Sequence, residues 1–271
     1  MLANKLFVES LQSFLEKTQE DKIVVKGIIS EFPDFASQTL EKILKQGFVK
    51  ILDIGAGNGM KALLLSDYFK NQNIKVILDA VEPKKEQIDL LENHYQNTDY
   101  LRTVFDKPFD EAELKETYDI VLVIHSLYEF SMQEDGTFLS MEKIYSCIAD
   151  DGVIIITMKD TYDDLEYLKY DLLPQLNRNV TISQESIEKT LHKLNIAFVT
   201  SKPLEMPFMV DKNKPALDIG YELNFMLSSS LEDRALLDTE CEALGNRVLA
   251  KVKEKGSPNL VLRDILTWVK K

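Results

Sequence analysis

Fully apolar runs of strand length, separated by helical stretches, constrain the fold of this chain more than any other feature of its sequence. Two of these runs read IVLVI at 120–124 and VIIIT at 153–157. A strand that is apolar on both faces is typical of a parallel sheet covered by helices on both sides, because an antiparallel sheet commonly keeps one polar face. Alternation of such strands with helices predicts a doubly wound α/β sheet with right-handed crossovers.

The order of the predicted elements divides the chain into two parts. The first five strands are expected at 47–55, 75–82, 100–105, 118–125 and 152–158. They are followed by a helix near 183–195, a sixth strand near 197–205, a helical insertion near 215–255 and a closing strand at 260–269. Before them, apolar residues at helical spacing predict helices within 4–45, the second of which Pro33 should break. We therefore expect a helical cap at 1–46 and an α/β domain at 47–271, with its insertion at about 206–259.

The charge of the chain excludes one class of substrate. It has 32 Lys and Arg residues against 45 Asp and Glu residues, which gives a formal net charge of −13. A nucleic-acid backbone would meet net repulsion instead of the basic surface that it needs. We therefore expect a small-molecule substrate and no nucleic-acid partner.

The sequence also predicts where the chain resides. Cys147 and Cys241 are its only cysteines, and its first residues lack the apolar run of a signal peptide. No stretch approaches the roughly 18 apolar residues that cross a bilayer. These features predict a cytoplasmic location and no membrane partner. The sequence does not fix the oligomeric state, and we expect a monomer.

The strongest local motif is a glycine loop, ILDIGAGNGM, at the end of the first predicted strand. Gly55, Gly57 and Gly59 follow Asp53, and small residues let a backbone approach a ligand closely. Met60 stands where a dinucleotide-binding motif would have its third glycine, so the spacing favours a methionine-derived cofactor over a pyrophosphate. The alternative is a glycine-rich turn without a ligand.

A carboxylate at the end of the second predicted strand strengthens this interpretation. Glu82 lies 27 positions after Gly55, in the segment DAVEPKKEQI. Its two oxygens match the two vicinal hydroxyl groups of a ribose. The alternative is a solvated charge at a strand end. Gln87 and Ile124 complete the expected cofactor site.

These motifs resemble class I S-adenosylmethionine-dependent methyltransferases across about 47–205. The resemblance implies a Rossmann-like, seven-stranded methyltransferase sheet with an N-terminal helical cap and a C-terminal helical insertion. Enzymes of this class that methylate nucleic-acid amino groups carry an Asn/Asp-Pro-Pro-aromatic run after the fourth strand. Here that place holds His125, Ser126, Leu127 and Tyr128, which agrees with the charge argument.

A closer resemblance is to histamine N-methyltransferase and its relatives. It rests on the collinear order of soft motifs through most of the chain. The segments are FVESLQSFLEKTQE at 7–20, VEPKKEQI at 81–88, YDIVLVIHSLYEF at 118–130, PQLNRNVTISQESIEKTLHKLNI at 174–196 and LVLRDILTWV at 260–269.

This resemblance implies an acceptor site. Glu20 matches a glutamate that binds the ammonium end of the substrate, and the alternative is a solvated acid at a helix end. His125 replaces a glutamine that contacts the substrate ring, and a histidine there can accept a proton near neutral pH or serve the structure only. Tyr128 matches an aromatic residue of the amine pocket. Asp264 replaces an asparagine near the methyl acceptor, and the alternatives are a salt bridge or an exposed strand end.

Departures from the family loosen the expected substrate. Glu129 stands in place of a tyrosine, and Tyr162 and Glu166 stand in place of two tryptophans. Extra carboxylates suit a more cationic or more polar amine than histamine.

The expected reaction is therefore methyl transfer from S-adenosylmethionine to a nitrogen of a small amine, leaving S-adenosylhomocysteine. Such a displacement needs alignment and a neutral attacking lone pair, and it needs no metal. The three scattered histidines, His94, His125 and His192, predict no metal site. One alternative is an oxygen or carboxyl methyltransferase with His125 as general base, and another is a catalytically silent protein that binds the cofactor.

Overall fold

The computed structural model describes residues 10–11, 13–160, 163–165, 168, 183–223 and 238–271. The chain forms two compact units. The larger unit comprises Val24–Met158, Ile182–Lys202 and Ile265–Lys271, and the smaller unit comprises Met1–Ile23, Lys159–Thr181 and Pro203–Asp264. Residues 24–46, which the sequence assigns to a separate cap, pack in the same unit as the first five strands.

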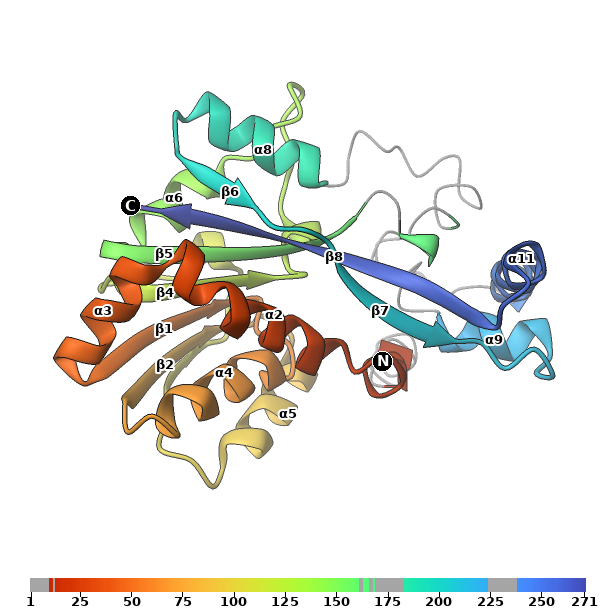
Figure 1. Ribbon diagram of the computed structural model, residues 1–271, viewed down its shortest axis with the longest axis horizontal. Coiled ribbons are helices and arrows are strands. Elements are labelled where there is room, and N and C mark those ends of the chain that lie inside the picture. The colour runs from red at the N-terminus through yellow and green to blue at the C-terminus, as the bar shows by residue number, and fades with distance from the viewer. Residues whose placement is uncertain (1–9, 12, 161–162, 166–167, 169–182, 224–237) are drawn as a thin grey trace. The chain divides into compact units, whose positions relative to one another are not determined.

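The strands form a doubly wound sheet, which confirms the predicted fold class (Figure 1). Its path runs in the order β3-β2-β1-β4-β5-β8-β6, and β7 pairs with β8 outside this path. The strand bounds are β1 Phe48–Ile54, β2 Lys75–Val81, β3 Leu101–Phe105, β4 Tyr118–Ile124, β5 Ile148–Lys159, β6 Phe198–Thr200, β7 Leu204–Met209 and β8 Asn259–Lys270. β1 pairs in parallel with β2 and with β4, β2 pairs in parallel with β3, and β4 pairs in parallel with β5. In the chain an α-helix lies between β1 and β2, between β2 and β3 and between β4 and β5, as is usual for parallel strands.

The predicted sixth strand is wrong in one respect, because the structure divides it into two strands. β6 pairs antiparallel with residues 267–269 of β8, and β7 pairs antiparallel with residues 259–264. Pro203 lies in the interruption between β6 and β7, where its missing N–H could not serve a ladder. The described sheet accordingly has eight strands instead of the expected seven.

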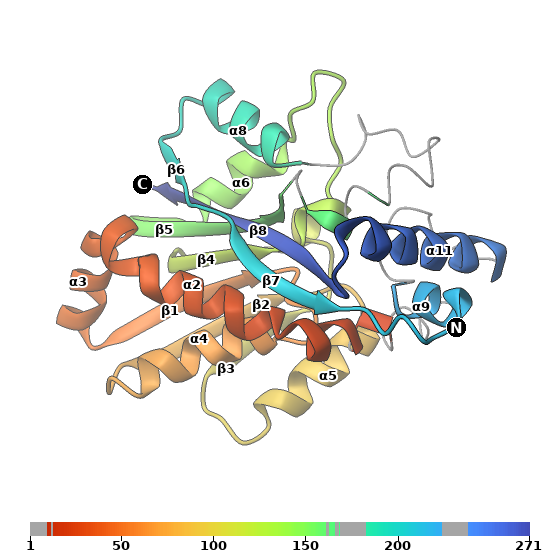
Figure 2. The ribbon, with the colours of Figure 1, turned by 45° about the vertical axis from the view of Figure 1, so that its right-hand side comes forward.

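Helices cover both faces of the sheet in the larger unit (Figures 1 and 2). α6 and α8 lie on one side, and α3, α4 and the part of α2 in this unit lie on the other. Their bounds, with those of α5, are α2 Glu20–Phe35, α3 Ser37–Gln46, α4 Met60–Lys70, α5 Lys85–Tyr95, α6 Ser140–Ser146 and α8 Gln184–Lys193. None of the helices that the structure describes combines the length and the apolar character of a membrane span. The cytoplasmic location stays a prediction.

The predicted break at Pro33 is wrong, because helix α2 continues past it to Phe35. Phe32 packs edge-on against Phe69 and Trp268, with ring centroids 6.1 Å and 5.8 Å apart. The indole Nε1 of Trp268 donates a hydrogen bond of 3.0 Å to Glu31 Oε2. A proline inside a helix costs about 3 kcal/mol, and this packing on both sides of Phe32 offsets that cost.

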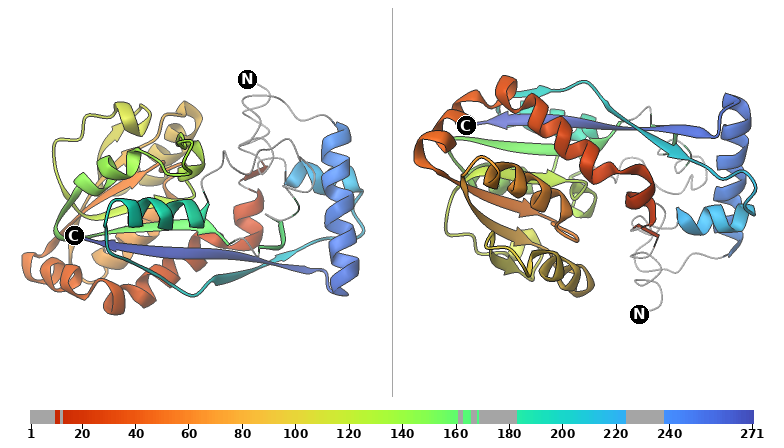
Figure 3. Two further views of the ribbon diagram at one scale, coloured as in Figure 1. Left: turned by 90° about the horizontal axis from the view of Figure 1, so that it is seen from above. Right: turned by 60° about the horizontal axis from the view of Figure 1, so that its bottom comes forward.

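Two helices of the smaller unit approach each other at the level of the backbone. α9 Ala216–Glu222 and α11 Asp238–Lys255 lie side by side (Figure 3). A Cβ atom added to Gly220 would lie 1.8 Å from the carbonyl oxygen of Cys241, and one added to Gly245 would lie 1.7 Å from that of Ala216. No flexible side chain separates the helices at these points, so both positions require glycine.

We predict that Gly245→Ala destabilises the protein. Inside a helix, replacing glycine by alanine normally stabilises the folded state by about 1 kcal/mol, so the expected effect has the opposite sign. The added methyl group meets backbone atoms, and overpacking of this kind costs about 1–3 kcal/mol. Urea unfolding measures the change. Lys253→Ala, at an exposed position of the same helix, is the matched control and should change little. A rise in the unfolding midpoint of Gly245→Ala would show that α9 and α11 do not pack in this way.

Candidate functional site

The carboxyl ends of β1 and β2 bring the glycine loop and Glu82 together. The N–H groups of Gly55 and Ala56 donate to the carbonyl oxygen of Val81 at 2.8 Å and 3.1 Å. The N–H of Gly57 then donates to Glu82 Oε2 at 2.8 Å. Parallel pairing of the two strands, with Ile54 opposite Val81, places these groups side by side.

Glu82 is a buried carboxylate, which excludes the alternative of a solvated charge. It is 5% exposed, and its Oε1 accepts a second backbone hydrogen bond of 2.9 Å from Lys84 N–H. Both oxygens of the Glu82 carboxylate thus accept a hydrogen bond from the backbone. Glu82 therefore holds the glycine loop, and its carboxylate is of the type that accepts hydrogen bonds from ribose hydroxyls.

The loop borders an open space at Gly57. This residue has φ +55°, and among the described residues a Cβ atom added there would have only Gln87 Oε1 within 4 Å, at 3.9 Å. The space that a side chain would fill is bounded by Gln87, whose side chain is buried in the first turn of α5. A cradle of this kind fits a cofactor that approaches the backbone closely.

Asp53 and Ile124 lie at the ends of the two central strands of this region. Asp53 is 5% exposed, and burial raises the pKa of its carboxyl to about 7; the Lys61 ammonium partly lowers that pKa, and the Glu82 carboxylate raises it. The carboxyl of Asp53 therefore changes its charge near neutral pH. Ile124 is buried at the last position of β4.

His125 follows β4 directly and adopts a backbone conformation that is rare for side-chain-bearing residues. Its φ is +53°, and its N–H donates a hydrogen bond of 3.0 Å to Thr157 O. The imidazole ring stacks on the ring of Tyr128, with centroids 6.3 Å apart and planes 6° apart. Strained backbone of this kind costs about 1–3 kcal/mol and is enriched at functional sites. The structure thus pairs two of the residues that the sequence singles out.

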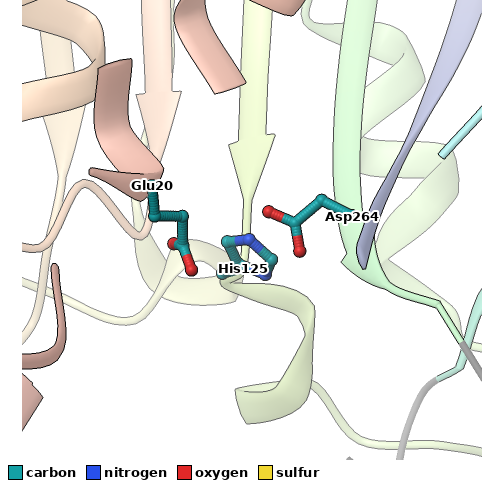
Figure 4. A group of neighbouring side chains, drawn as sticks. All are labelled: Glu20, His125 and Asp264. Carbon is teal, nitrogen blue, oxygen red and sulfur yellow. The ribbon is translucent and has the colours of Figure 1, made fainter. Parts of the chain in front are cut away.

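Glu20 and Asp264 meet at a third residue, Lys159, in the smaller unit. The Lys159 ammonium lies 2.9 Å from Glu20 Oε2 and 2.8 Å from Asp264 Oδ1. Glu20 is 4% exposed and Asp264 is 0% exposed. The solvated helix end given as the alternative for Glu20 and the exposed strand end given for Asp264 are therefore excluded, whereas the salt bridge that was the other alternative for Asp264 is present. Figure 4 shows Glu20 at the start of α2, Asp264 on β8 and His125 after β4.

Lys159 is the residue of this cluster that the sequence analysis missed. Burial lowers the pKa of its ammonium, but the carboxylates of Asp264, Glu20 and Asp163 raise that pKa well above its ordinary value. Lys159 therefore stays protonated and cannot act as a general base. Its ammonium also lies 5.8 Å from the centroid of the Phe14 ring. A charged residue directly after the apolar run of β5 was the signal available in the sequence.

Three of the family departures cannot be placed. Tyr162 and Glu166 lie outside the described residues, as does the side chain of Glu129.

Comparison with known proteins supports the fold. The YcgJ protein of Bacillus subtilis is 14% identical, with a TM-score of 0.53, over 86% of this chain and 97% of that one. A putative methyltransferase of Bacillus halodurans is 9% identical, with a TM-score of 0.54, over 87% and 98%. No curated protein matches the chain. The closer resemblance to histamine N-methyltransferase has no support here and stays a prediction.

The sequence itself matches a family model. That model is described as a methyltransferase domain, and it matches residues 8–201, more than half of the 271-residue chain. The chain therefore belongs to the methyltransferase domain family, and S-adenosylmethionine is its methyl donor.

Proposed function

We propose that this protein transfers the methyl group of S-adenosylmethionine to a nitrogen of a small-molecule amine that carries one further positive charge. The observation that carries the proposal is the buried cluster of Glu20, Lys159 and Asp264. Two carboxylates contact one ammonium, and Asp163 adds a further negative charge near it, so the cluster would favour a cation. An ammonium group of the acceptor would supply that cation.

The cofactor would be held by residues of the larger unit. Glu82 has the acceptor capacity for ribose hydroxyls, and the open space at Gly57, bounded by Gln87, suits close approach of the ligand. Asp53 supplies a carboxylate whose charge suits the cationic end of S-adenosylmethionine. The cofactor itself supplies an electrophilic methyl group on a sulfonium.

The acceptor must combine charge recognition with an uncharged attacking atom. A protonated nitrogen has no lone pair, so the ammonium that Glu20 and Asp264 bind cannot be the nucleophile while it is bound as a cation. A second, neutral nitrogen of the same molecule would attack the methyl group. His125 is the candidate to accept the proton released afterwards, because a neutral imidazole carries a nitrogen lone pair that can accept a proton.

A screen for S-adenosylhomocysteine release tests this function. The compounds would be monoamines, diamines, hydroxyl compounds and carboxylic acids, each with the same carbon skeleton where possible. We expect turnover with amines that keep a second cationic group. Turnover restricted to hydroxyl compounds or acids would establish an oxygen methyltransferase instead. Tight binding of S-adenosylmethionine without any turnover would indicate a silent cofactor-binding protein. An oligonucleotide serves as a negative control, because the net charge of −13 opposes its binding.

We predict that Glu82→Ala weakens S-adenosylmethionine binding by about 1.5–3 kcal/mol, the range for hydrogen bonds to a charged group. The substitution removes the acceptor for the ribose and also the anchor of Gly57 N–H. Isothermal titration calorimetry measures the affinity. Glu86→Ala, at an exposed position four residues later, should leave it unchanged. Equal affinity of Glu82→Ala and the wild type would remove Glu82 from the cofactor site.

We predict that S-adenosylmethionine affinity rises with pH between about 5.5 and 7, where the α-amino group of the cofactor stays protonated. The Asp53 carboxyl has a pKa of about 7, so it is largely neutral at the lower pH and must lose its proton to pair with a cation. The affinity should fall by at most about tenfold for each pH unit below 7. Calorimetry in two buffers with different ionisation enthalpies should detect the released proton at pH 6. The idea fails if Asp53→Asn keeps the same pH profile.

We predict that Asp264→Asn raises the KM of the best amine about tenfold and leaves S-adenosylmethionine affinity nearly unchanged. The reason is that the cluster loses the negative charge that the acceptor ammonium would balance, a loss worth about 1.4 kcal/mol. Asp264→Leu should be worse, because it also removes the hydrogen bond to Lys159. Glu205→Gln, which removes the same charge from an exposed position on β7, is the control. An unchanged KM in Asp264→Asn would make this carboxylate only a structural partner of Lys159.

A further inference from the structure

The last turn of α5 is bonded to the glycine loop through two consecutive residues. The hydroxyl of Tyr95 donates a hydrogen bond of 3.0 Å to the carbonyl oxygen of Gly59. The Nδ1 atom of His94 lies 2.8 Å from the carbonyl oxygen of Asn58. A carbonyl oxygen can only accept, so Nδ1 must be the protonated nitrogen of this imidazole. Neighbouring residues of one helix therefore bind neighbouring carbonyls of the loop.

These two bonds fix the orientation of two peptide groups. A peptide is planar, so a carbonyl oxygen that is held in place also fixes the N–H of the next residue. With Asn58 O held, the N–H of Gly59 points to Ala56 O at 2.9 Å. With Gly59 O held, the N–H of Met60 points to the side-chain oxygen of Asn58 at 3.1 Å. Gly59 O also accepts a hydrogen bond of 3.0 Å from Leu63 N–H of α4, so α4 and α5 hold this peptide group together, whereas the donor to Asn58 O comes from α5.

Gly59 is shaped by the same helix. Its φ is +74°, and a Cβ atom added there would lie 2.8 Å from Tyr95 Cε2 and 2.9 Å from Leu91 Cγ. Because Gly59 has no side chain, the Tyr95 ring can pack against the loop at the residue before α4. The other end of α5 borders the loop as well, because Gln87 bounds the open space at Gly57.

The Tyr95 hydroxyl is a permanent donor. It is 3% exposed, and burial, followed by the charges of Asp53 and Asp67, raises the pKa of its hydroxyl. The proton therefore remains on this oxygen over the whole range in which the protein would be assayed.

We propose that His94 and Tyr95 are positioning residues that hold the glycine loop in its cofactor-binding conformation through the carbonyl groups of Asn58 and Gly59. Neither side chain needs to touch the cofactor. These two side chains orient the peptide groups of the loop before the cofactor binds. Cofactor binding then does not include the entropy cost of ordering them.

Tyr95→Phe and His94→Leu test the proposal, because each removes one donor. We expect each to raise the Kd of S-adenosylmethionine and of S-adenosylhomocysteine about fivefold, as the loss of one hydrogen bond of ordinary strength implies. Amide hydrogen exchange at residues 57–60 should become faster in the protein without ligand. His94→Asn, which keeps a donor near the position of Nδ1, should restore most of the affinity.

Tyr100→Phe is the matched control, because the Tyr100 hydroxyl also donates a single bond, of 2.9 Å, to Asp67 Oδ1 and not to the loop. It should lower the unfolding midpoint about as much as Tyr95→Phe does while leaving both Kd values and the exchange at 57–60 unchanged. The proposal is overturned if Tyr95→Phe loses only stability, as Tyr100→Phe does. The role of His94 is overturned if His94→Asn raises the two Kd values as much as His94→Leu does.

Discussion

Parallel, in-register pairing of β1 with β2 is the constraint on which the candidate cofactor site depends. It brings Val81 O within reach of two N–H groups of the loop and sets Glu82 beside Gly57 N–H. A carboxylate buried in this way would be costly without donors, and the backbone N–H groups of Gly57 in the loop and of Lys84 supply them. The same contacts therefore satisfy the acid and shape the turn. The register of β1 and β2 therefore determines both the conformation of the loop and the position of the carboxylate that would bind a ribose.

Much of this could be predicted from the sequence, because the signals were local. Apolar runs such as 120–124 revealed buried parallel strands, and the spacing from Gly55 to Glu82 located two strand ends that meet at one edge of the sheet. The prediction was wrong where tertiary contacts outweighed local preference. Pro33 remains inside α2 because Phe32 packs on Phe69 and Trp268. The eighth strand was missed because the interruption at 201–203 is visible only once β6 and β7 are seen pairing with different parts of β8.

The acceptor region shows a different limit of sequence analysis. Family resemblance directed attention to Glu20 and Asp264 as two acids available to a ligand, but it did not reveal that Lys159 lies between them. Glu20 and Lys159 are separated by 139 positions in the chain, and Lys159 and Asp264 by 105, so no periodicity links them. A buried charge requires compensation, and the general expectation of a partner was sound. The identity of that partner became clear only from the fold.

The attachment of the glycine loop to α5 has a consequence for how such a loop can vary. Its anchors are main-chain carbonyls, which every amino acid offers, whereas the donors come from His94 and Tyr95. Substitutions at Ala56 or Met60 therefore leave the acceptors in place, while a substitution at His94 or Tyr95 removes one of the side-chain donors. These donors lie 36 positions downstream of the residues that they bind, so a related protein whose loop has a different sequence could still keep the conformation of the loop.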